Sequence, residues 1–220
     1  CARSSGGVAR GRHPGDYGPD MKRLFDIIVA GACLVVLSPL AALIAIAIKL
    51  EDGGPVLFTQ DRVGLGGRVF TALKFRSMVV DAERETGAVQ ATLNDPRVTG
   101  VGRILRATAF DELPQLWNIL RGDMSVVGPR PLRPGEADTT ADGRLLPLSA
   151  IPGYLARHRV RPGLTGLAQV YAPRDLPRTG KFRYDLLYQQ RAGLCLDLRL
   201  ILLSFWITAR GRWEDRDAKV

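Results

Sequence analysis

The chain has 220 residues and a formal net charge of +9 at pH 7, which suits one domain with a buried core and an anionic partner. Nucleic acid, anionic lipid headgroups and a nucleotide sugar are all compatible with this charge. The 3 cysteines and 2 histidines are widely separated, which excludes a disulfide framework and zinc-type spacing and gives little support to a Ser-His-Asp hydrolase.

The first fifty residues divide into a polar part and an apolar part. Residues 1–20 are rich in Gly, Arg and Ser and lack apolar periodicity, so they are predicted to be disordered. Residues 24–50 are almost wholly apolar and, at about 40 Å as a straight helix, are long enough to span a bilayer. We therefore predict a membrane anchor over residues 21–50.

The anchor carries a proline at its centre, which predicts a bend. Pro39 removes one helical hydrogen bond and clashes with the carbonyl of Val35. Basic residues flank the segment, Lys22 and Arg23 before it and Lys49 at its end, and positive charge tends to stay cytoplasmic. This pattern favours a re-entrant helix-break-helix that enters one leaflet and returns; a kinked single-pass helix is the alternative.

Residues 56–76 have the pattern of a β-hairpin. Apolar and β-branched runs flank the glycine-rich stretch 64–67. The glycines lack the Lys-Ser/Thr and the strand-then-helix context of a phosphate-binding loop, so a plain turn is favoured. On the return strand Lys74 and Arg76 share one face, because strand side chains alternate. A solvated basic edge is one interpretation of that pair.

Two adjacent carboxylates, Asp111 and Glu112, lie at the predicted start of a short helix. Asp111 is the expected N-cap, Pro114 suits the first turn, and Gly122 ends the helix. The predicted apolar face consists of Leu113, Leu116, Trp117 and Leu120. Neighbouring helical side chains point about 100° apart, so the carboxylates suit two different tasks. A capping Asp111 with a solvated Glu112 is the alternative.

Basic residues flank these carboxylates in the sequence. Arg106 lies five positions before Asp111 and reaches it if the chain turns between them; a solvated arginine is equally open. Arg130 is held between two prolines, and a rigid guanidinium can present its planar fork to a phosphate. Residues 157–161 form a basic cluster without aromatic stacking residues or a helix-turn-helix pattern. Anionic headgroups or a diphosphate therefore suit the cluster better than nucleic acid.

The C-terminal part contributes one more carboxylate and one more apolar segment. Asp185 has aromatic neighbours and lies four positions after Lys181, so a helix-surface ion pair is its simplest interpretation. Residues 194–209 are apolar but too short to span a membrane comfortably. With Trp206 and Arg210 near its end, the segment is predicted to be a helix at the membrane interface or packed on the anchor.

Five motifs, in one order, resemble those of the bacterial sugar transferases. They read KFRSM at 74–78, DELPQL at 111–116, GDMS at 122–125, GPRP at 128–131 and RPGLTG at 161–166. The resemblance is to the small monotopic phosphoglycosyl transferases, which start polysaccharide and glycan assembly on a polyprenyl phosphate. It covers about residues 21–213. Relatives commonly carry Asn-Gly where this chain has Tyr171 and Ala172, so the motifs alone do not assign the sugar.

The resemblance implies a fold and a reaction. It implies an α+β, mostly helical monotopic protein, with a catalytic domain over residues 51–213 and a tail over residues 214–220. The expected location is the cytoplasmic face of the inner membrane, among membrane lipids. The implied reaction moves a sugar 1-phosphate from a UDP-sugar to polyprenyl (undecaprenyl) phosphate and releases UMP. It starts exopolysaccharide, capsule, O-antigen or glycoprotein glycan synthesis.

The resemblance also assigns roles to residues. Asp111 would attack the sugar-linked phosphate and carry the phosphosugar, and Glu112 would coordinate Mg²⁺ (or Mn²⁺). The implied phosphate and substrate contacts are Lys74, Arg76, Arg106, Arg130 and Asp185, the last near the metal. No nucleic acid is expected as a partner, and an oligomer is possible. A catalytically silent membrane scaffold and a membrane-anchored nucleic-acid binder stay open as alternatives, the latter on charge alone.

Overall fold

The computed structural model describes residues 18–82, 84, 95–139, 144–173, 175–211 and 213, and it has the predicted α+β, mostly helical composition. Most of the segment predicted to be disordered, and the whole of the predicted tail, lie outside these residues. The longer elements are α1 (Pro19–Asp52), β1 (Leu57–Val63), β2 (Val69–Phe75), α2 (Gly100–Thr108), α3 (Gln115–Arg121), α6 (Arg178–Arg191) and α7 (Leu194–Ala209). The shorter ones are β3 (Ser125–Val127), β4 (Ala137–Thr139), β5 (Leu145–Pro147), α4 (Tyr154–Arg157), β6 (Gly163–Thr165) and α5 (Leu167–Tyr171). Single 3₁₀ turns are η1 (Leu65–Gly67), η2 (Phe110–Glu112) and η3 (Leu148–Ala150).

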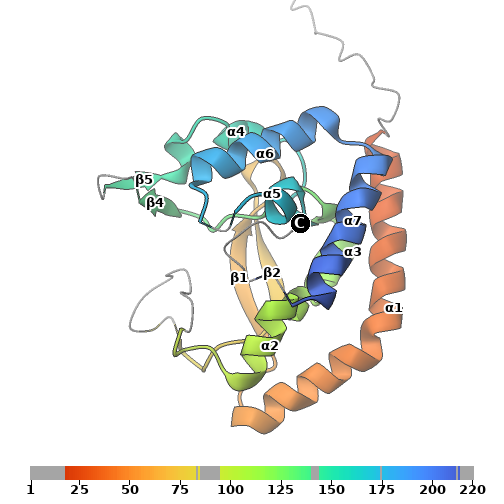
Figure 1. Ribbon diagram of the computed structural model, residues 1–220, viewed down its shortest axis with the longest axis vertical. Coiled ribbons are helices and arrows are strands. Elements are labelled where there is room, and N and C mark those ends of the chain that lie inside the picture. The colour runs from red at the N-terminus through yellow and green to blue at the C-terminus, as the bar shows by residue number, and fades with distance from the viewer. Residues whose placement is uncertain are drawn as a thin grey trace, which may run out of the picture.

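Helix α1 is long and apolar enough to cross a membrane, and it bends near its middle, as Figure 1 shows. Pro39 has no N–H to donate to the carbonyl of Val35, so that carbonyl loses its helical partner. The hydroxyl of Ser38 replaces the missing donor at 2.8 Å from the Val35 oxygen. The predicted bend is therefore present, and the Ser-Pro pair satisfies the backbone where it occurs. Whether the helix enters one leaflet and returns stays a prediction.

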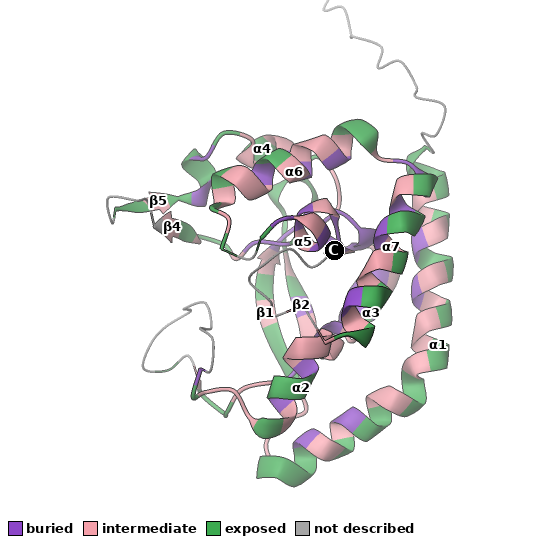
Figure 2. Ribbon diagram, viewed as in Figure 1, coloured by how far each residue is buried: buried purple, intermediate pink, exposed green. Residues whose placement is uncertain are grey.

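Most of the apolar surface of α1 faces outward rather than into the protein. Only 11% of its most apolar 18-residue stretch is buried, which is far less than for the core helix of a globular domain. Figure 2 shows the same distribution, with buried positions scattered singly along α1. The helix is thus suited to membrane association.

The predicted hairpin is confirmed, and α3 lies against it. Strands β1 and β2 pair antiparallel from Leu57 with Phe75 to Val63 with Val69, and η1 forms the glycine turn. The buried side chain of Asn118 on α3 accepts from the Leu73 N–H at 3.0 Å and donates to the Thr71 carbonyl at 2.9 Å. The amide thereby satisfies backbone groups of β2 and fixes the strand that carries Lys74.

Two of the sequence motifs meet backbone to backbone in a small parallel sheet. Strand β3 pairs with β6 in the register Ser125 with Gly163 and Val127 with Thr165. A Cβ atom on Gly163 would lie 2.0 Å from the Gly128 nitrogen, so only glycine permits this approach. The packing fixes the chain as it leaves β3 and enters the Pro-Arg-Pro segment.

The main core lies between α1, α3, α7 and the parallel sheet. Its buried members are Ala30, Leu116, Ile119, Met124, Val126, Val127, Val170, Tyr188, Leu200 and Ile207. The predicted apolar face of α3 is partly wrong: Ile119 is fully buried, whereas the Trp117 side chain is 52% exposed. Because α3 begins only at Gln115, its short inner face consists of Leu116 and Ile119, three positions apart.

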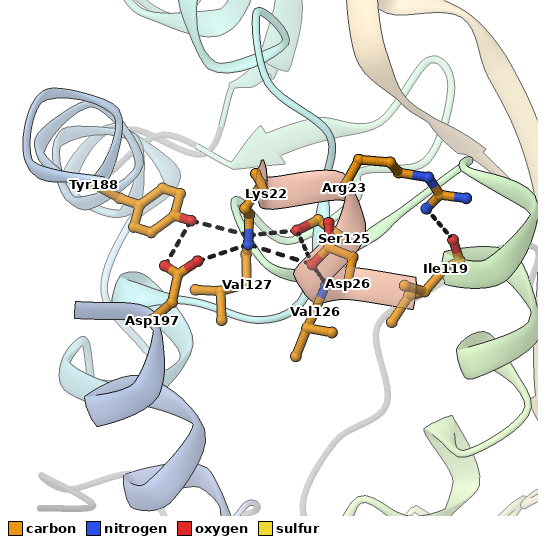
Figure 3. A network of polar contacts seen from close by, with 9 residues as sticks. All are labelled: Lys22, Arg23, Asp26, Ile119, Ser125, Val126, Val127, Tyr188 and Asp197. Atoms are coloured by element: carbon orange, nitrogen blue, oxygen red, sulfur yellow. Dashed lines mark hydrogen bonds and ion pairs between the residues drawn. The ribbon is translucent and has the colours of Figure 1, made fainter. Parts of the chain in front are cut away.

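A buried polar network joins α1 to β3 and α7, and it is drawn in Figure 3. The Lys22 ammonium lies 2.7 Å from Oδ2 of Asp197 and 3.4 Å from Oδ1 of Asp26. Both carboxylates are fully buried. Asp26 also accepts from the Ser125 hydroxyl and the Val126 N–H, each at 3.0 Å, so one side chain of α1 binds the start of β3.

The neighbouring arginine joins α1 to the end of α3. The Arg23 guanidinium donates to the carbonyls of Ile119 at 2.5 Å and Leu120 at 2.7 Å. These carbonyls belong to the last turn of α3, where the Ile119 oxygen also accepts from the Gly122 N–H at 3.0 Å. A cation at this end also compensates the negative end of the helix dipole.

We expect Lys22→Ala to destabilise the fold strongly, because it leaves Asp26 and Asp197 buried with no cation between them. Removing one partner of a buried ion pair costs about 3–5 kcal/mol. Chemical denaturation of the detergent-solubilised protein measures this loss. Arg199→Ala, at an exposed position of α7, is the control and should change stability by less than about 0.5 kcal/mol. A Lys22→Ala protein as stable as that control would contradict this role of the network.

Candidate active site

The two adjacent carboxylates lie in η2, between α2 and α3, and not at the N-cap of a helix as predicted. Pro114 cannot donate to the Phe110 carbonyl, and the Leu113 N–H bonds that carbonyl at 3.2 Å instead. The chain therefore makes a 3₁₀ turn, and α3 starts at Gln115. Asp111 and Glu112 are both buried. The alternative of a capping aspartate with a solvated glutamate is thus wrong for both residues.

Glu112 is held by two cations from different parts of the chain. Its Oε1 accepts from the Lys74 ammonium at 2.6 Å and from the Arg130 guanidinium at 2.8 Å. Burial alone would raise the pKa of Glu112, but Arg130 and Lys74 outweigh it and lower the pKa to about 2. Glu112 is therefore ionised at neutral pH.

Asp111 has the opposite electrostatic environment. Burial raises the pKa of its carboxyl to about 6, against the opposing charge of Lys74. The negative charge of Glu112 raises this pKa further, and Arg130 and Arg106 lower it. An anion that is poorly compensated holds its electrons less tightly than a paired one, so Asp111 is the better nucleophile of the two.

Arg130 is positioned by a buried ion pair behind it. Arg157 donates from Nη2 to the Arg130 carbonyl at 2.6 Å and from Nε to Oδ2 of Asp185 at 2.8 Å. Asp185 is thus paired with Arg157 rather than with Lys181, the partner expected from helical spacing. Burial raises the pKa of Asp185, and the Arg157 charge opposes the shift. Asp185 therefore acts on the Pro-Arg-Pro segment through Arg157.

The remaining predicted residues differ in where they lie. Arg106 on α2 lines the same cavity as Asp111. Arg76 also lines it, but its guanidinium binds the Asp52 carboxylate and the Pro55 carbonyl, which ties the end of β2 to the end of α1. The alternation of side chains along the strand correctly predicts that Arg76 faces the same cavity as Lys74. It does not predict that the Asp52 carboxylate is the partner of Arg76. Lys74, Arg130 and Glu112 meet directly, and Asp111 interacts electrostatically with all three and with Arg106.

The basic cluster at residues 157–161 is not the surface patch that the sequence suggests. Arg157 and His158 are buried, and Arg161 donates to the Gly122 carbonyl at 2.9 Å. Burial lowers the pKa of His158 to about 4, with Arg157 adding to the shift. The cluster is mainly internal and supports the loops around the site.

One cavity of about 930 Å³ contains the carboxylates and extends beyond them. A basic part of its wall combines one residue of the segment after Pro131 with two residues of the first turn of α6. Arg133, Arg178 and Lys181 lie there, with Glu136 bound to Arg178. Burial lowers the pKa of Lys181 to about 8, and the charges of Arg178 and Arg130 lower it further. Such a wall suits a phosphate-rich ligand.

The carboxylates also fit a divalent cation brought by a phosphate ligand. The described residues contain no cluster of three or more His, Cys, Asp and Glu side chains that could hold a metal unaided. Mg²⁺, however, is usually bound by one or two carboxylates together with substrate phosphates and water. Both hydrogen bonds to Glu112 end on Oε1, and Oε2 is the oxygen that such an ion would use.

Comparison with known proteins gives one family. The sequence model described as bacterial sugar transferase matches residues 18–211. The undecaprenyl-phosphate glucose phosphotransferase of Komagataeibacter xylinus is 46% identical over 190 residues, which are 83% of this chain and 35% of that protein. The UDP-glucose:undecaprenyl-phosphate glucose-1-phosphate transferase of Klebsiella pneumoniae is 45% identical over 83% of this chain and 39% of its own length. The chain thus spans less than half of these two relatives. The exopolysaccharide production protein PSS of Rhizobium leguminosarum bv. phaseoli is 43% identical, over 82% of this chain and 91% of its own length.

We expect Asp185→Asn to lower the stability of the protein in the absence of any divalent cation. The change removes the charge that compensates Arg157, whose side chain is 3% exposed, and the expected loss is on the order of 3 kcal/mol. Denaturation in EDTA measures it, with Arg183→Gln on the exposed side of α6 as control. A variant as stable as wild type that has lost only its Mg²⁺ dependence would instead make Asp185 a metal ligand.

Proposed function

This chain belongs to the bacterial sugar transferase family, and we propose that it transfers glucose 1-phosphate from UDP-glucose to polyprenyl (undecaprenyl) phosphate, giving polyprenyl diphosphate glucose and UMP. The single observation that carries the proposal is the carboxylate pair, with the pKa of Asp111 raised and that of Glu112 lowered inside a basic cavity. The choice of glucose and of the lipid acceptor follows the names of two relatives, a glucose phosphotransferase and a glucose-1-phosphate transferase that both act on undecaprenyl phosphate.

In the first step, the ionised carboxylate of Asp111 attacks the sugar-linked phosphorus of UDP-glucose. A bond forms between an Asp111 oxygen and that phosphorus, and the bond from the phosphorus to the bridging oxygen breaks. UMP leaves with the electron pair of the broken bond. Lys74 and Arg130 lie where they neutralise the phosphate oxygens, because both already converge on Glu112 beside the nucleophile.

In the second step, an oxygen of polyprenyl phosphate attacks the same phosphorus. The new diphosphate bond forms, the bond to Asp111 breaks, and the aspartate carboxylate is regenerated. Two displacements let the two anionic substrates occupy the site in turn instead of together. The same cations can therefore serve both steps.

Mg²⁺ (or Mn²⁺) would be held by Glu112 together with phosphate oxygens of the substrate. When bound, it would add positive charge against the charge that accumulates on the diphosphate. Glu112 suits this task because Arg130 and Lys74 keep it ionised.

The donor is water-soluble and the acceptor is a lipid, so the reaction belongs at a membrane surface. We propose that α1 enters the cytoplasmic leaflet of the inner membrane, turns at Ser38 and Pro39, and returns to the same side. The bend, the hydrogen bond from Ser38 and the exposed apolar side chains of α1 support this topology. The outward apolar side chains of α7, among them Leu198, Leu202 and Trp206, suit the same interface.

We expect the enzyme to release UMP from UDP-glucose without any lipid acceptor, at most once per active site, and to retain the phosphosugar. Intact-protein mass spectrometry and a UMP assay record both events. Asp111→Asn keeps the size of the side chain but removes the nucleophile, so both signals should vanish. Glu112→Gln should retain them at a lower rate and with weaker Mg²⁺ dependence.

Two results would contradict this mechanism. UMP that forms only when polyprenyl phosphate is present would show direct transfer and exclude an aspartyl intermediate. Release of UDP would show an ordinary glycosyl transfer and exclude phosphosugar transfer altogether. A silent scaffold or a nucleic-acid binder would release neither nucleotide, and the binder would instead show a steeply salt-dependent affinity for duplex DNA.

The topology has its own test. In a background without the native cysteines, thiols at Asp20→Cys, in the first turn of α1, and at Pro55→Cys, just after its end, should react only from the cytoplasmic side; both positions are exposed. The Ser38→Ala/Pro39→Leu variant restores the missing N–H donor and is expected to straighten α1, placing the two thiols on opposite sides. Opposite sides in the unmodified helix would establish a single-pass span.

A further inference from the structure

The wall of the cavity changes in chemical character from one part to another. Its charged part includes Lys74, Arg106, Asp111, Glu112, Arg130, Arg133, Arg157, Arg178, Lys181 and Asp185. The lining also includes apolar side chains of α1, α3, β3 and α7 and of the residue after η2, namely Val29, Cys33, Leu113, Leu116, Val126, Ile201 and Phe205; Ser204, which lies among them, is hydrogen-bonded to Thr165. We call the part of the cavity lined by these apolar side chains the apolar arm. The reaction residues proposed above all lie outside it.

The apolar arm begins beside the nucleophile. Leu113 follows Asp111 by two positions, lines the cavity, and packs against the main core cluster. Val29, Cys33 and Ile201 pack against that same cluster, so with Leu113 they belong to one continuous apolar packing unit. A ligand group at Asp111 can therefore extend directly into the arm.

The arm also reaches the outward apolar side of α7. Phe205 lines the cavity, yet its side chain is 56% exposed. Leu198 and Leu202 precede it at helical spacing and are exposed as well, which makes one continuous apolar strip. The cavity thus connects the charged site with the surface expected to contact lipid.

An apolar cavity of this kind has a physical preference for an apolar occupant. Side chains that border an empty space lose dispersion contacts, and an apolar cavity binds little water but takes up hydrocarbon. UDP-glucose has no hydrocarbon part that could fill the arm. A prenyl phosphate has a phosphate at one end and hydrocarbon from the first carbon onward, which matches the sequence of charged and apolar lining.

We propose that the apolar arm holds the first isoprene units of the acceptor lipid while its phosphate lies beside Asp111. The inference rests on the proposed function, because it takes a prenyl phosphate as the second substrate. It adds a binding site for the hydrocarbon of the acceptor, which the donor does not use. Blocking the arm should therefore affect the second displacement and not the first.

The two free cysteines of the described chain supply a matched pair of variants. Cys33→Phe puts an aromatic ring into the apolar arm, and Cys195→Phe makes the same change at an exposed position near the start of α7. We expect Cys33→Phe to lower kcat/KM for undecaprenyl phosphate at least tenfold. Its lipid-independent release of UMP should stay within twofold of wild type. Cys195→Phe should leave both unchanged.

Chain length gives a second readout on the same proteins. In the wild type, kcat/KM should rise from methyl phosphate through one-, two- and three-isoprene phosphates, because each unit buries more hydrocarbon in the arm. In Cys33→Phe this rise should be flattened. Val29→Phe blocks the arm from another position on α1 and should behave in the same way if Cys33→Phe does not fold.

The outcomes separate this inference from the function on which it rests. Two results would overturn the proposal and assign the arm to bulk membrane lipid. One is an equal kcat/KM for undecaprenyl phosphate in Cys33→Phe and Cys195→Phe. The other is a change in the binding of Cys33→Phe to lipid vesicles without a change in that kcat/KM. A folded Cys33→Phe protein that also loses the first release of UMP would place the arm in the donor site. Absence of UMP from the wild type, with and without lipid, would reject the proposed function itself.

Discussion

The arrangement of this protein depends on one ammonium group shared by two fully buried carboxylates. Lys22 bridges Asp26 on its own helix and Asp197 on α7, and separating any of the three would leave a charge in a low-dielectric interior. The network also contains the first residues of β3, whose continuation carries Arg130. The apolar helix α1 and the strand that leads to Arg130 are therefore positioned by the same buried contacts.

Charge is also buried at the site itself, where the three carboxylates are compensated by cations to different degrees. Glu112 receives two cations, Asp185 receives one, and Asp111 is compensated only at longer range. The fold would be more stable if all three carboxylates were paired with cations or were replaced by apolar groups. The incomplete compensation of Asp111 suits the nucleophilic role proposed for it, because full pairing would lower its basicity.

Features that follow from local chemistry could be predicted from the sequence, whereas those that need a distant partner could not. The bend at Pro39, the hairpin around the glycines and the end of α3 at Gly122 each depend on a few adjacent residues. The Lys22–Asp197 pair joins positions 175 residues apart, and Arg157–Asp185 joins positions 28 apart. In the sequence, Asp197 is a single charge inside an apolar run, and Arg157 is one arginine of a basic cluster. Neither pattern names a partner. The carboxylate pair itself was found, but Pro114 converted the expected N-cap into a 3₁₀ turn.

The distribution of positive charge bears on why a covalent intermediate suits this site. Lys74 and Arg130 both converge on Glu112, and the same two cations, with Arg106, also act on Asp111 beside it. A direct transfer would place a diphosphate and a phosphomonoester near these shared cations at once, and the two anions would repel each other. Sequential occupation removes that repulsion, since UMP carries away its charge before the acceptor phosphate arrives. The sharing of these cations is thus a second argument for the proposed aspartyl intermediate, beside the character of Asp111.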